Sequence, residues 1–212
     1  MIIPTDKPEE HLERARPFIE AGLPVFIDKP LTDQPDHLDQ FIQWQSQGHQ
    51  ILSTSAMRYA KEWNDAKSQL DQVGSLRLIT MTTPKSWERY GIHALEGVCQ
   101  FLEPGGWDRV TNTGHGQSNI VHCYHSSGVE VVLAAIDDMY GAFGCLGLYG
   151  TKGNLFVQMT DTFAAFRSQM VAFVDYVRTG QLPFEFSQTV ELMQIIMAAV
   201  TSRNQNGKTI AL

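Results

Sequence analysis

The 212-residue chain carries 16 basic and 23 acidic side chains, a net charge of −7, and has no lysine- or arginine-rich run, so no nucleic-acid partner is expected. With 43% hydrophobic and 18% charged residues it is expected to form one large or two small soluble domains, with neither a membrane span nor a signal peptide. The three cysteines, Cys99, Cys123 and Cys145, have the spacing of neither a disulfide framework nor a zinc finger, which favours a cytoplasmic protein.

The first part of the chain alternates short apolar runs with helical patterns. Thr5 or Asp6 is expected to cap a first helix, and Asp33 or Asp36 a second. Short apolar runs without alternation are typical of strands buried on both faces. Such runs occur at Ile2–Ile3, Val25–Ile27 and Ile51–Ser53. The order of strands and helices predicts a parallel βαβ arrangement.

From about Arg58 the pattern changes to an α+β domain. One helix is expected through Trp63 and Leu70 as far as Gly74, and another over 93–102. Runs with strand character, separated by turn residues, predict a mostly antiparallel open sheet packed on helices. These runs are Leu76–Thr83, Ser118–His125, Val129–Ile136, Phe143–Tyr149 and Asn154–Met159.

The end of the chain and one central strand complete this domain. Two amphipathic helices are expected, the first ending at Gly180 and the second capped by Ser187. The run Val129–Ile136 is apolar on both of its alternating faces. One face is therefore expected to pack on helices and the other to meet a second subunit.

Lys29 is the first candidate for chemistry. It stands between Asp28 and Pro30 at the carboxyl end of a predicted parallel strand, where open α/β sheets bind ligands. Desolvation at such a place would suit a lysine to proton transfer or to orienting a hydroxyl group. Taken alone, the tripeptide favours the simpler interpretation, a strand-end turn with a solvated lysine.

His93 is the second candidate. Histidine suits acid–base chemistry near neutral pH, and Glu96 lies on the same helical face, where it could orient the ring. The alternative is a histidine near a helix start that is satisfied by local hydrogen bonds. A further pair, His122 and His125, would point to opposite faces of a strand, so no metal site is expected.

Together these segments resemble the Gfo/Idh/MocA oxidoreductases, which include glucose–fructose oxidoreductase and inositol dehydrogenase. The resemblance follows the chain in order over nearly its whole length. Gly22–Leu31 is similar to the family's Glu-Lys-Pro segment, Ser55–Tyr59 to the Arg-aromatic start of its second domain, Gly91–Glu96 to its Gly-x-His-x-x-Asp segment, Tyr149–Leu155 to its Gly-Thr-x-Gly turn, and Gly207–Leu212 to its final strand.

The resemblance implies hydride exchange between NAD or NADP and a hydroxyl-bearing carbon of a sugar or cyclitol. It implies that Lys29 and His93 are catalytic, with Lys29 beside the nicotinamide and His93 as the acid–base residue. The segment Asp28–Pro30 would contact the cofactor. Arg58, Trp87 and Tyr90 would be substrate contacts.

The chain departs from the family pattern at two positions near these residues. Asp28 replaces the usual glutamate, which keeps the charge and shortens the reach. Four residues before the histidine, where the family commonly has an aspartate, stands Arg89, with Glu88 beside it. A histidine without a carboxylate partner is less well oriented. Either Glu88 substitutes, or the site does not use the usual proton relay.

A larger departure is the missing glycine-rich turn. Residues 1–57 contain no Gly-x-Gly-x-x-Gly, the segment that binds the pyrophosphate of a dinucleotide. Residues 1–57 therefore correspond to the back half of a Rossmann domain, and 58–212 to the C-terminal substrate and oligomerisation domain. For such a truncated chain we expect weak or no dinucleotide binding.

Two consequences follow for partners and function. An incomplete Rossmann sheet exposes an unpaired edge, so a homo-oligomer is expected, through that edge or through the open face of the second sheet. The alternative to an oxidoreductase is a non-catalytic module, derived from the same family, that binds a sugar-like ligand or serves in assembly.

Overall fold

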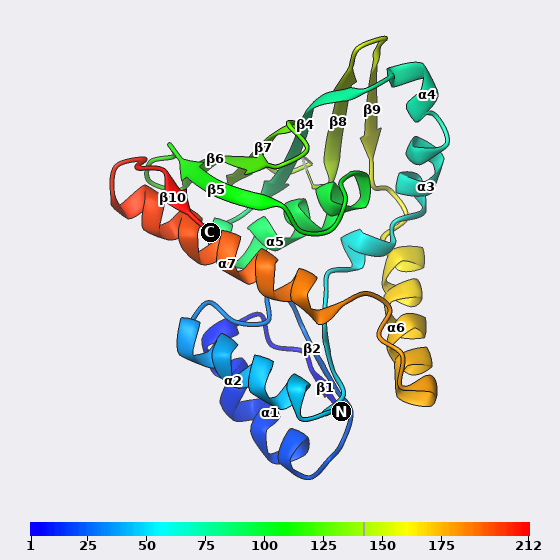
Figure 1. Ribbon diagram of the computed structural model, residues 1–212, viewed down its shortest axis with the longest axis vertical. Helices are drawn as coiled ribbons and strands as arrows, with labels where there is room; N and C mark the ends of the chain where they lie inside the picture. Colours follow the sequence, from blue (N-terminus) through cyan, green and yellow to red (C-terminus); the bar gives the residue numbers. More distant parts are fainter. Residues whose placement is uncertain (142) are drawn as a thin grey trace.

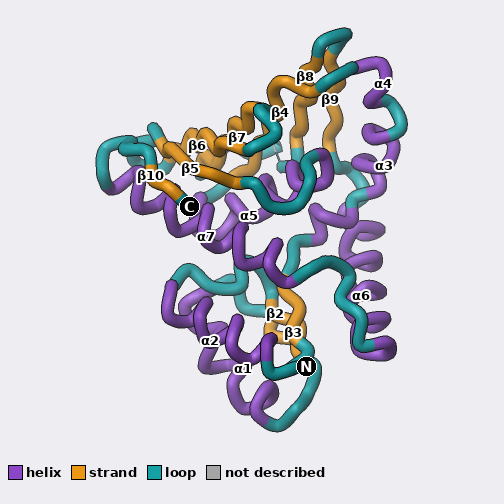
Figure 2. Tube along the Cα trace, viewed as in Figure 1, coloured by secondary structure: helices purple, strands orange, loops and turns teal. Residues whose placement is uncertain are grey.

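The computed structural model describes residues 1–141 and 143–212 and contains two β-sheets flanked by helices (Figure 1). The smaller sheet is formed by the first part of the chain, and the larger one by the remainder (Figure 2). The combination of a short parallel sheet and a mostly antiparallel sheet packed on helices confirms the predicted fold class. No helix within the described residues is long and apolar enough to cross a membrane.

The smaller sheet has three parallel strands in the order β1-β2-β3, as predicted. Its strands are β1 (Ile2–Ile3), β2 (Val25–Ile27) and β3 (Ile51–Ser53). Helices α1 (His11–Glu20) and α2 (Pro35–Ser46) lie on one side, and α6 (Thr162–Thr179) lies on the other (Figure 1). Burial on both sides explains why the strands contain consecutive apolar residues.

The predicted caps of the first two helices were wrong. Helix α1 follows a 3-10 turn, η1 (Pro8–Glu10), and Glu10 occupies its N-cap. The Thr5 hydroxyl instead accepts a hydrogen bond from the backbone N–H of Lys7. Helix α2 has Gln34 at its N-cap, because a proline follows at the first helical position, where its fixed φ angle suits the helix.

The larger sheet has seven strands in the order β10-β5-β6-β7-β4-β8-β9. Strands β4 and β7 run parallel, and the other described pairs of this sheet run antiparallel. The strands are β4 (Leu76–Pro84), β5 (Trp107–Asn112), β6 (Ser118–His125), β7 (Glu130–Ile136), β8 (Cys145–Gly150), β9 (Asn154–Gln158) and β10 (Ile210–Ala211). Strand β5 was not predicted, because among its residues only Val110 and Asn112 are buried.

Helices α5 (Trp87–Val98) and α7 (Phe186–Asn204) pack on one face of this sheet (Figure 1). Helix α5 begins before the predicted position and is followed by the 3-10 turn η3 (Cys99–Phe101). The single helix expected before Gly74 is divided into α3 (Lys61–Lys67) and α4 (Leu70–Val73). Helix α7 has Glu185 rather than Ser187 at its N-cap.

The opposite face of the larger sheet is covered by no helix that the structure describes. In β7 the residues Val131, Leu133 and Ala135 are buried beneath the helices, whereas Val132, Ala134 and Ile136 are half-exposed. On the uncovered face Ile120 is 39% exposed and Phe156 is 67% exposed. The predicted packing of one face of this strand on helices is therefore confirmed, and the second subunit expected on the other face stays a prediction.

One hydrophobic cluster connects the two sheets. It runs from Ile3 and Val25 of the small sheet to Leu133 of the large one, and it includes the fully buried Trp63 and Trp87. The 3-10 helix η2 (Ala56–Tyr59) joins β3 to the second part of the chain and packs against both α5 and α6. This shared core places the ends of β1 and β2 close to helix α5.

Candidate active site

A pocket of about 660 Å³ lies where the carboxyl ends of β1 and β2 meet α5 and α6. Ligands of parallel sheets bind at this end of the strands. Its polar lining includes Asp6, Asp28, Lys29, Lys85, Tyr90, His93, Tyr140 and Gln169, and its apolar lining includes Phe26, Phe143, Phe166 and Met170. Of the residues predicted to be functional, Asp28, Lys29, Tyr90 and His93 line this pocket.

Lys29 is only 8% exposed, although it lies in the loop that follows β2. Its Nζ is 3.7 Å from Asp28 Oδ2 and 4.9 Å from the centre of the Tyr90 ring. Burial raises the pKa of the Asp28 carboxyl, against the opposing effect of the Lys29 ammonium. The solvated lysine of the simpler interpretation is therefore excluded.

His93, on α5, is 6% exposed and lies between two aromatic rings. The centres of the Tyr90 and Phe143 rings are each 4.9 Å from the centre of the imidazole. Burial lowers the pKa of His93 well below its ordinary value, and Lys29 and then Lys85 act in the same direction. The imidazole is consequently neutral at neutral pH.

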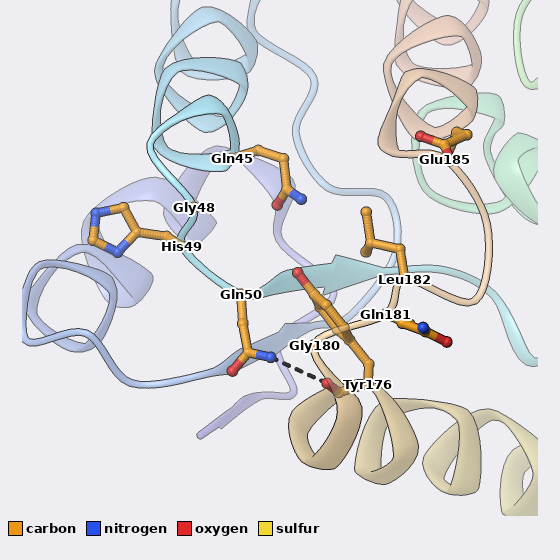
Figure 3. Close-up of a pocket in the computed structure, with 9 residues that line it drawn as sticks. All are labelled: Gln45, Gly48, His49, Gln50, Tyr176, Gly180, Gln181, Leu182 and Glu185. Carbon is orange, nitrogen blue, oxygen red and sulfur yellow. Dashed lines mark hydrogen bonds between the residues drawn. The ribbon is translucent and has the colours of Figure 1, made fainter.

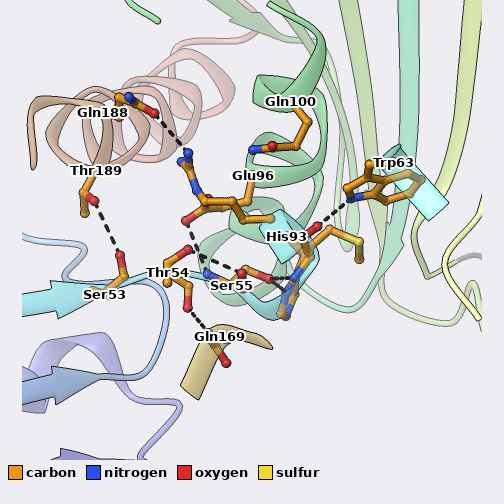
Figure 4. Close-up of polar contacts among 12 residues, drawn as sticks. Ser53, Thr54, Ser55, Trp63, His93, Glu96, Gln100, Gln169, Gln188 and Thr189 are labelled. Carbon is orange, nitrogen blue, oxygen red and sulfur yellow. Dashed lines mark hydrogen bonds and ion pairs between the residues drawn. The ribbon is translucent and has the colours of Figure 1, made fainter. Parts of the chain in front are cut away.

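Ser55 is the functional neighbour of His93 that sequence reasoning missed. Its Oγ is 2.7 Å from His93 Nδ1, and the two residues are joined by a dashed line in Figure 4. Ser55 is fully buried and is the N-cap of η2, directly after β3. The signal in the sequence is the run Ser53-Thr54-Ser55, three consecutive hydroxyl residues at the carboxyl end of a buried strand.

Glu96 positions Ser55 rather than the imidazole. One carboxylate oxygen, Oε1, accepts a hydrogen bond of 3.3 Å from the Ser55 backbone N–H (Figure 4). The other carboxylate oxygen accepts from Arg58 Nε. Arg58 also donates to Gln188 Oε1 at 3.0 Å. The predicted orienting role of Glu96 is thus indirect. Arg58 itself is held in this network and is not among the described residues that line the pocket.

Trp87 and Tyr90, the other two expected substrate contacts, have different surroundings. Trp87 is fully buried, and its indole N–H donates to the backbone carbonyl of Ile196 on α7. It is not among the described lining residues. Tyr90 lines the pocket, and its Oη is 2.7 Å from Lys85 Nζ. Of these two residues, only Tyr90 is placed to contact a bound molecule.

The two residues near the position of the missing aspartate bind other partners. Glu88 forms an ion pair with Arg203 of α7. Arg89 Nη1 lies 3.7 Å from Asp6 Oδ2. The sequence left open whether Glu88 replaces the missing aspartate. In the structure the side chain in contact with His93 Nδ1 is Ser55 and not Glu88.

A second pocket, of about 640 Å³, lies between the ends of α2 and α6 (Figure 3). It is lined by glutamine side chains together with His49, Tyr176 and Glu185. The Gln50 side chain, which lines this pocket, donates to the Tyr176 carbonyl at 3.1 Å. Lys29 and His93 belong to the other pocket, which is therefore the better candidate for chemistry.

Comparison with solved structures identifies the architecture. A putative myo-inositol dehydrogenase from Sinorhizobium meliloti 1021 superimposes with a TM-score of 0.82 at 16% identity, covering 99% of this chain and 80% of that one. A putative NADPH-dependent oxidoreductase from Desulfitobacterium hafniense DCB-2 gives a TM-score of 0.85 at 17% identity, covering 99% and 78%. This chain has a Gfo/Idh/MocA-type fold.

A third similar structure contains a dinucleotide. GenD2 from gentamicin A biosynthesis, in complex with NAD, gives a TM-score of 0.83 at 15% identity and covers 100% of this chain and 77% of that one. No family model matches the sequence, and no curated protein matches it either. At these identities the likeness establishes the fold, and in this respect the resemblance predicted from the sequence is confirmed.

Proposed function

We propose that this chain carries the reaction site of a nicotinamide-dependent oxidoreductase that interconverts a hydroxyl and a carbonyl group on a sugar or cyclitol. The observation that supports this most directly is the convergence of Lys29 and His93 on Tyr90 in one pocket at the ends of parallel strands. The neighbours with the same fold include myo-inositol dehydrogenases and a protein in complex with NAD.

The proposed roles follow from the surroundings of each side chain. The nicotinamide, when bound, supplies or accepts the hydride. Lys29, buried beside Asp28, is the group that hydrogen-bonds the reacting oxygen and carries its proton. The neutral imidazole of His93 forms a second hydrogen bond to the same oxygen. Tyr90, between the two, forms part of the wall.

The described residues suit the nicotinamide end of the cofactor better than its pyrophosphate. Phe26, Phe166 and Met170 give the pocket an apolar wall near Lys29, which suits a nicotinamide ring. Within residues 1–57 the only glycines are Gly22 and Gly48, each with positive φ just after a helix, and no glycine-rich turn is available for a pyrophosphate. We therefore propose weak dinucleotide binding by these residues.

Titration with NADH followed by fluorescence, together with an assay of polyol oxidation, tests the proposed function. Saturable binding with turnover is expected for the wild-type chain. Lys29→Met should lower kcat by about 100- to 10,000-fold, because the proton carrier is lost. Lys208→Met, which removes an exposed lysine, serves as the matched control.

The outcome also distinguishes the non-catalytic alternative. Absence of NADH binding and of turnover would overturn the enzymatic proposal for this chain. Binding of a polyol by calorimetry under the same conditions would then favour a ligand-binding module.

We further propose that a second copy of the chain covers the open face of the larger sheet. Ile120 and Phe156 are exposed on this face, and the half-exposed Val132 lies between them in the sheet order. Large apolar side chains exposed on one face of a sheet can mark a protein interface. The homo-oligomer expected from the sequence would thus form through this face of the sheet.

A further inference from the structure

We propose that Ser55 is a positioning residue, which donates its hydroxyl proton to Nδ1 of His93 and so places the only N–H of the imidazole on Nε2. The assignment of the proton follows from the hydrogen bonds around Ser55. What it means for the reaction rests on the proposed function above.

The Ser55 hydroxyl has two hydrogen-bond contacts among the residues that the structure describes. Its Oγ accepts from the backbone N–H of Met57 at 3.0 Å, and it lies 2.7 Å from His93 Nδ1. The hydroxyl has one proton to donate. Since Ser55 is fully buried, this proton has to find an acceptor within the protein.

Two arrangements of the proton between Ser55 and His93 can be compared. If Nδ1–H donated to Oγ, the hydroxyl proton would be left without an acceptor in the described part of the chain. Leaving a buried donor unpaired costs about 1–3 kcal/mol. If the hydroxyl donates to Nδ1, every polar group of the Ser55 side chain and Nδ1 itself are satisfied. The hydrogen-bond count therefore favours the second arrangement.

The surroundings hold both partners in this geometry. The Ser55 backbone N–H is bound to Glu96, which is in turn bound to Arg58. The imidazole is enclosed by the rings of Tyr90 and Phe143. A neutral imidazole has a single N–H, and the lowered pKa of His93 keeps it neutral. Once Nδ1 accepts, that N–H lies on Nε2.

The Nε2 atom of His93 is available to form a hydrogen bond with a ligand. No hydrogen-bond partner of Nε2 is present in residues 1–141 and 143–212, and His93 lines the pocket. With its N–H there, His93 stabilises negative charge that develops on a substrate oxygen, by donating a hydrogen bond. It has no lone pair at Nε2 with which to take the hydroxyl proton. Lys29 is then the side chain that carries the proton, as a neutral amine when it accepts the hydroxyl proton in oxidation and as an ammonium when it donates a proton to the carbonyl oxygen in reduction.

This assignment gives a chemical meaning to the arginine at position 89. A carboxylate partner at Nδ1 would favour a proton on that nitrogen and would stabilise an imidazolium. A hydroxyl that donates to Nδ1 has the opposite effect. In this chain the contact to Nδ1 is a hydroxyl, so we infer a histidine that works as a hydrogen-bond donor and not as a general base.

Nuclear magnetic resonance of chain labelled with ¹⁵N-histidine tests the assignment without any cofactor. Long-range ¹H–¹⁵N correlations distinguish a protonated from an unprotonated ring nitrogen, and His93→Asn identifies the signals that belong to His93. We expect an unprotonated Nδ1 and a protonated Nε2 in the wild-type chain near neutral pH. A protonated Nδ1 would overturn the proposal.

Two variants add a functional readout. Ser55→Ala removes the donor, so the His93 signals should shift toward the other tautomer, and kcat should fall about 10- to 100-fold with little change in the Kd for NADH. Ser55→Thr keeps the hydroxyl and should restore both the spectrum and the rate. An unchanged His93 spectrum in Ser55→Ala would contradict the proposal.

The test separates this inference from the proposed function. If wild-type chain shows the expected tautomer but neither binds NADH nor turns over a polyol, the proton assignment stands and the enzymatic function is wrong. If the chain is active and Nδ1 is protonated, the function stands and the role of Ser55 is wrong. The wild-type spectrum decides the matter even if a variant fails to fold.

Discussion

His93 combines a titratable ring with surroundings that oppose its charge. The aromatic rings of Tyr90 and Phe143 exclude water, and two lysines in the same pocket lower the pKa of the imidazole further. Protonation of such a ring is unfavourable, so His93 lowers the stability of the folded chain at low pH. The same property suits a hydrogen-bond donor that must stay neutral.

The pH dependence of stability follows from this lowered pKa. Below about pH 6.5 the unfolded chain protonates the histidine while the folded chain keeps it neutral, so the unfolded state binds more protons. The free energy of unfolding should therefore decrease as the pH falls, with a contribution of up to about 1.4 kcal/mol per pH unit from this residue. Above the unfolded pKa the contribution is constant.

Urea unfolding between about pH 5 and 7 measures this slope. The wild-type chain should lose stability more steeply than His93→Asn, because the variant lacks the titrating group. His49→Asn, at a half-buried position away from the pocket, is the matched control and should follow the wild type. Equal slopes for the wild type and His93→Asn would show that folding does not lower the pKa of His93.

Helix α5 joins the site to the core. Trp87 and Gly91 are one turn apart, and a Cβ atom placed on Gly91 would lie 2.6 Å from Trp87 Cε3. The glycine thus makes room for the indole, which is in turn anchored to the Ile196 carbonyl of α7. This packing sets the position of the helix that carries Tyr90 and His93.

Gly91→Ala should destabilise the chain although alanine is the better helix former. The clash with a rigid, fully buried indole is of the overpacking type, which costs about 1–3 kcal/mol, and helix propensity returns at most about 1 kcal/mol. Gly97→Ala is the matched control. Its Cβ would meet mainly the flexible end of Met81, which can move aside. Urea unfolding should show a larger loss for Gly91→Ala, and equal stabilities would contradict this account.

The whole molecule has one covered and one uncovered face on its larger sheet. Helices α5 and α7 cover the inner face of the sheet (Figure 1). On the outer face Ile120 and Phe156 are exposed. Another exposed apolar residue, Phe163, lies on α6, away from this sheet. Substitutions in these two regions therefore test which surface forms the proposed dimer.

Sedimentation velocity at micromolar concentration should show a dimer of the wild-type chain. The double variant Ile120→Lys and Phe156→Glu should sediment as a monomer, because charges would be buried at the proposed interface. Both residues are exposed, so the fold should be preserved. Phe163→Lys is the control and should remain dimeric. A monomeric wild-type chain would rule out the proposed interface.

Most of the elements were predictable because burial of an element produces a local pattern of apolar residues in the sequence. The three short apolar runs became β1, β2 and β3, and the alternating runs became strands of the larger sheet. Helix starts were less predictable, as at Gln34 and Glu185, because several neighbouring residues can serve as an N-cap. Strand β5 had too few buried side chains for a recognisable pattern.

The fold class and the two principal candidates, Lys29 and His93, could be predicted from the order of residues, since strand ends and helix patterns are local properties. Which side chains meet depends on the tertiary structure. Ser55 and His93 are 38 positions apart and come together because η2 packs against α5. The same packing left Trp87 in the core and paired Glu88 with Arg203. Contacts between distant segments depend on how whole elements pack, and no local pattern of residue types records that arrangement.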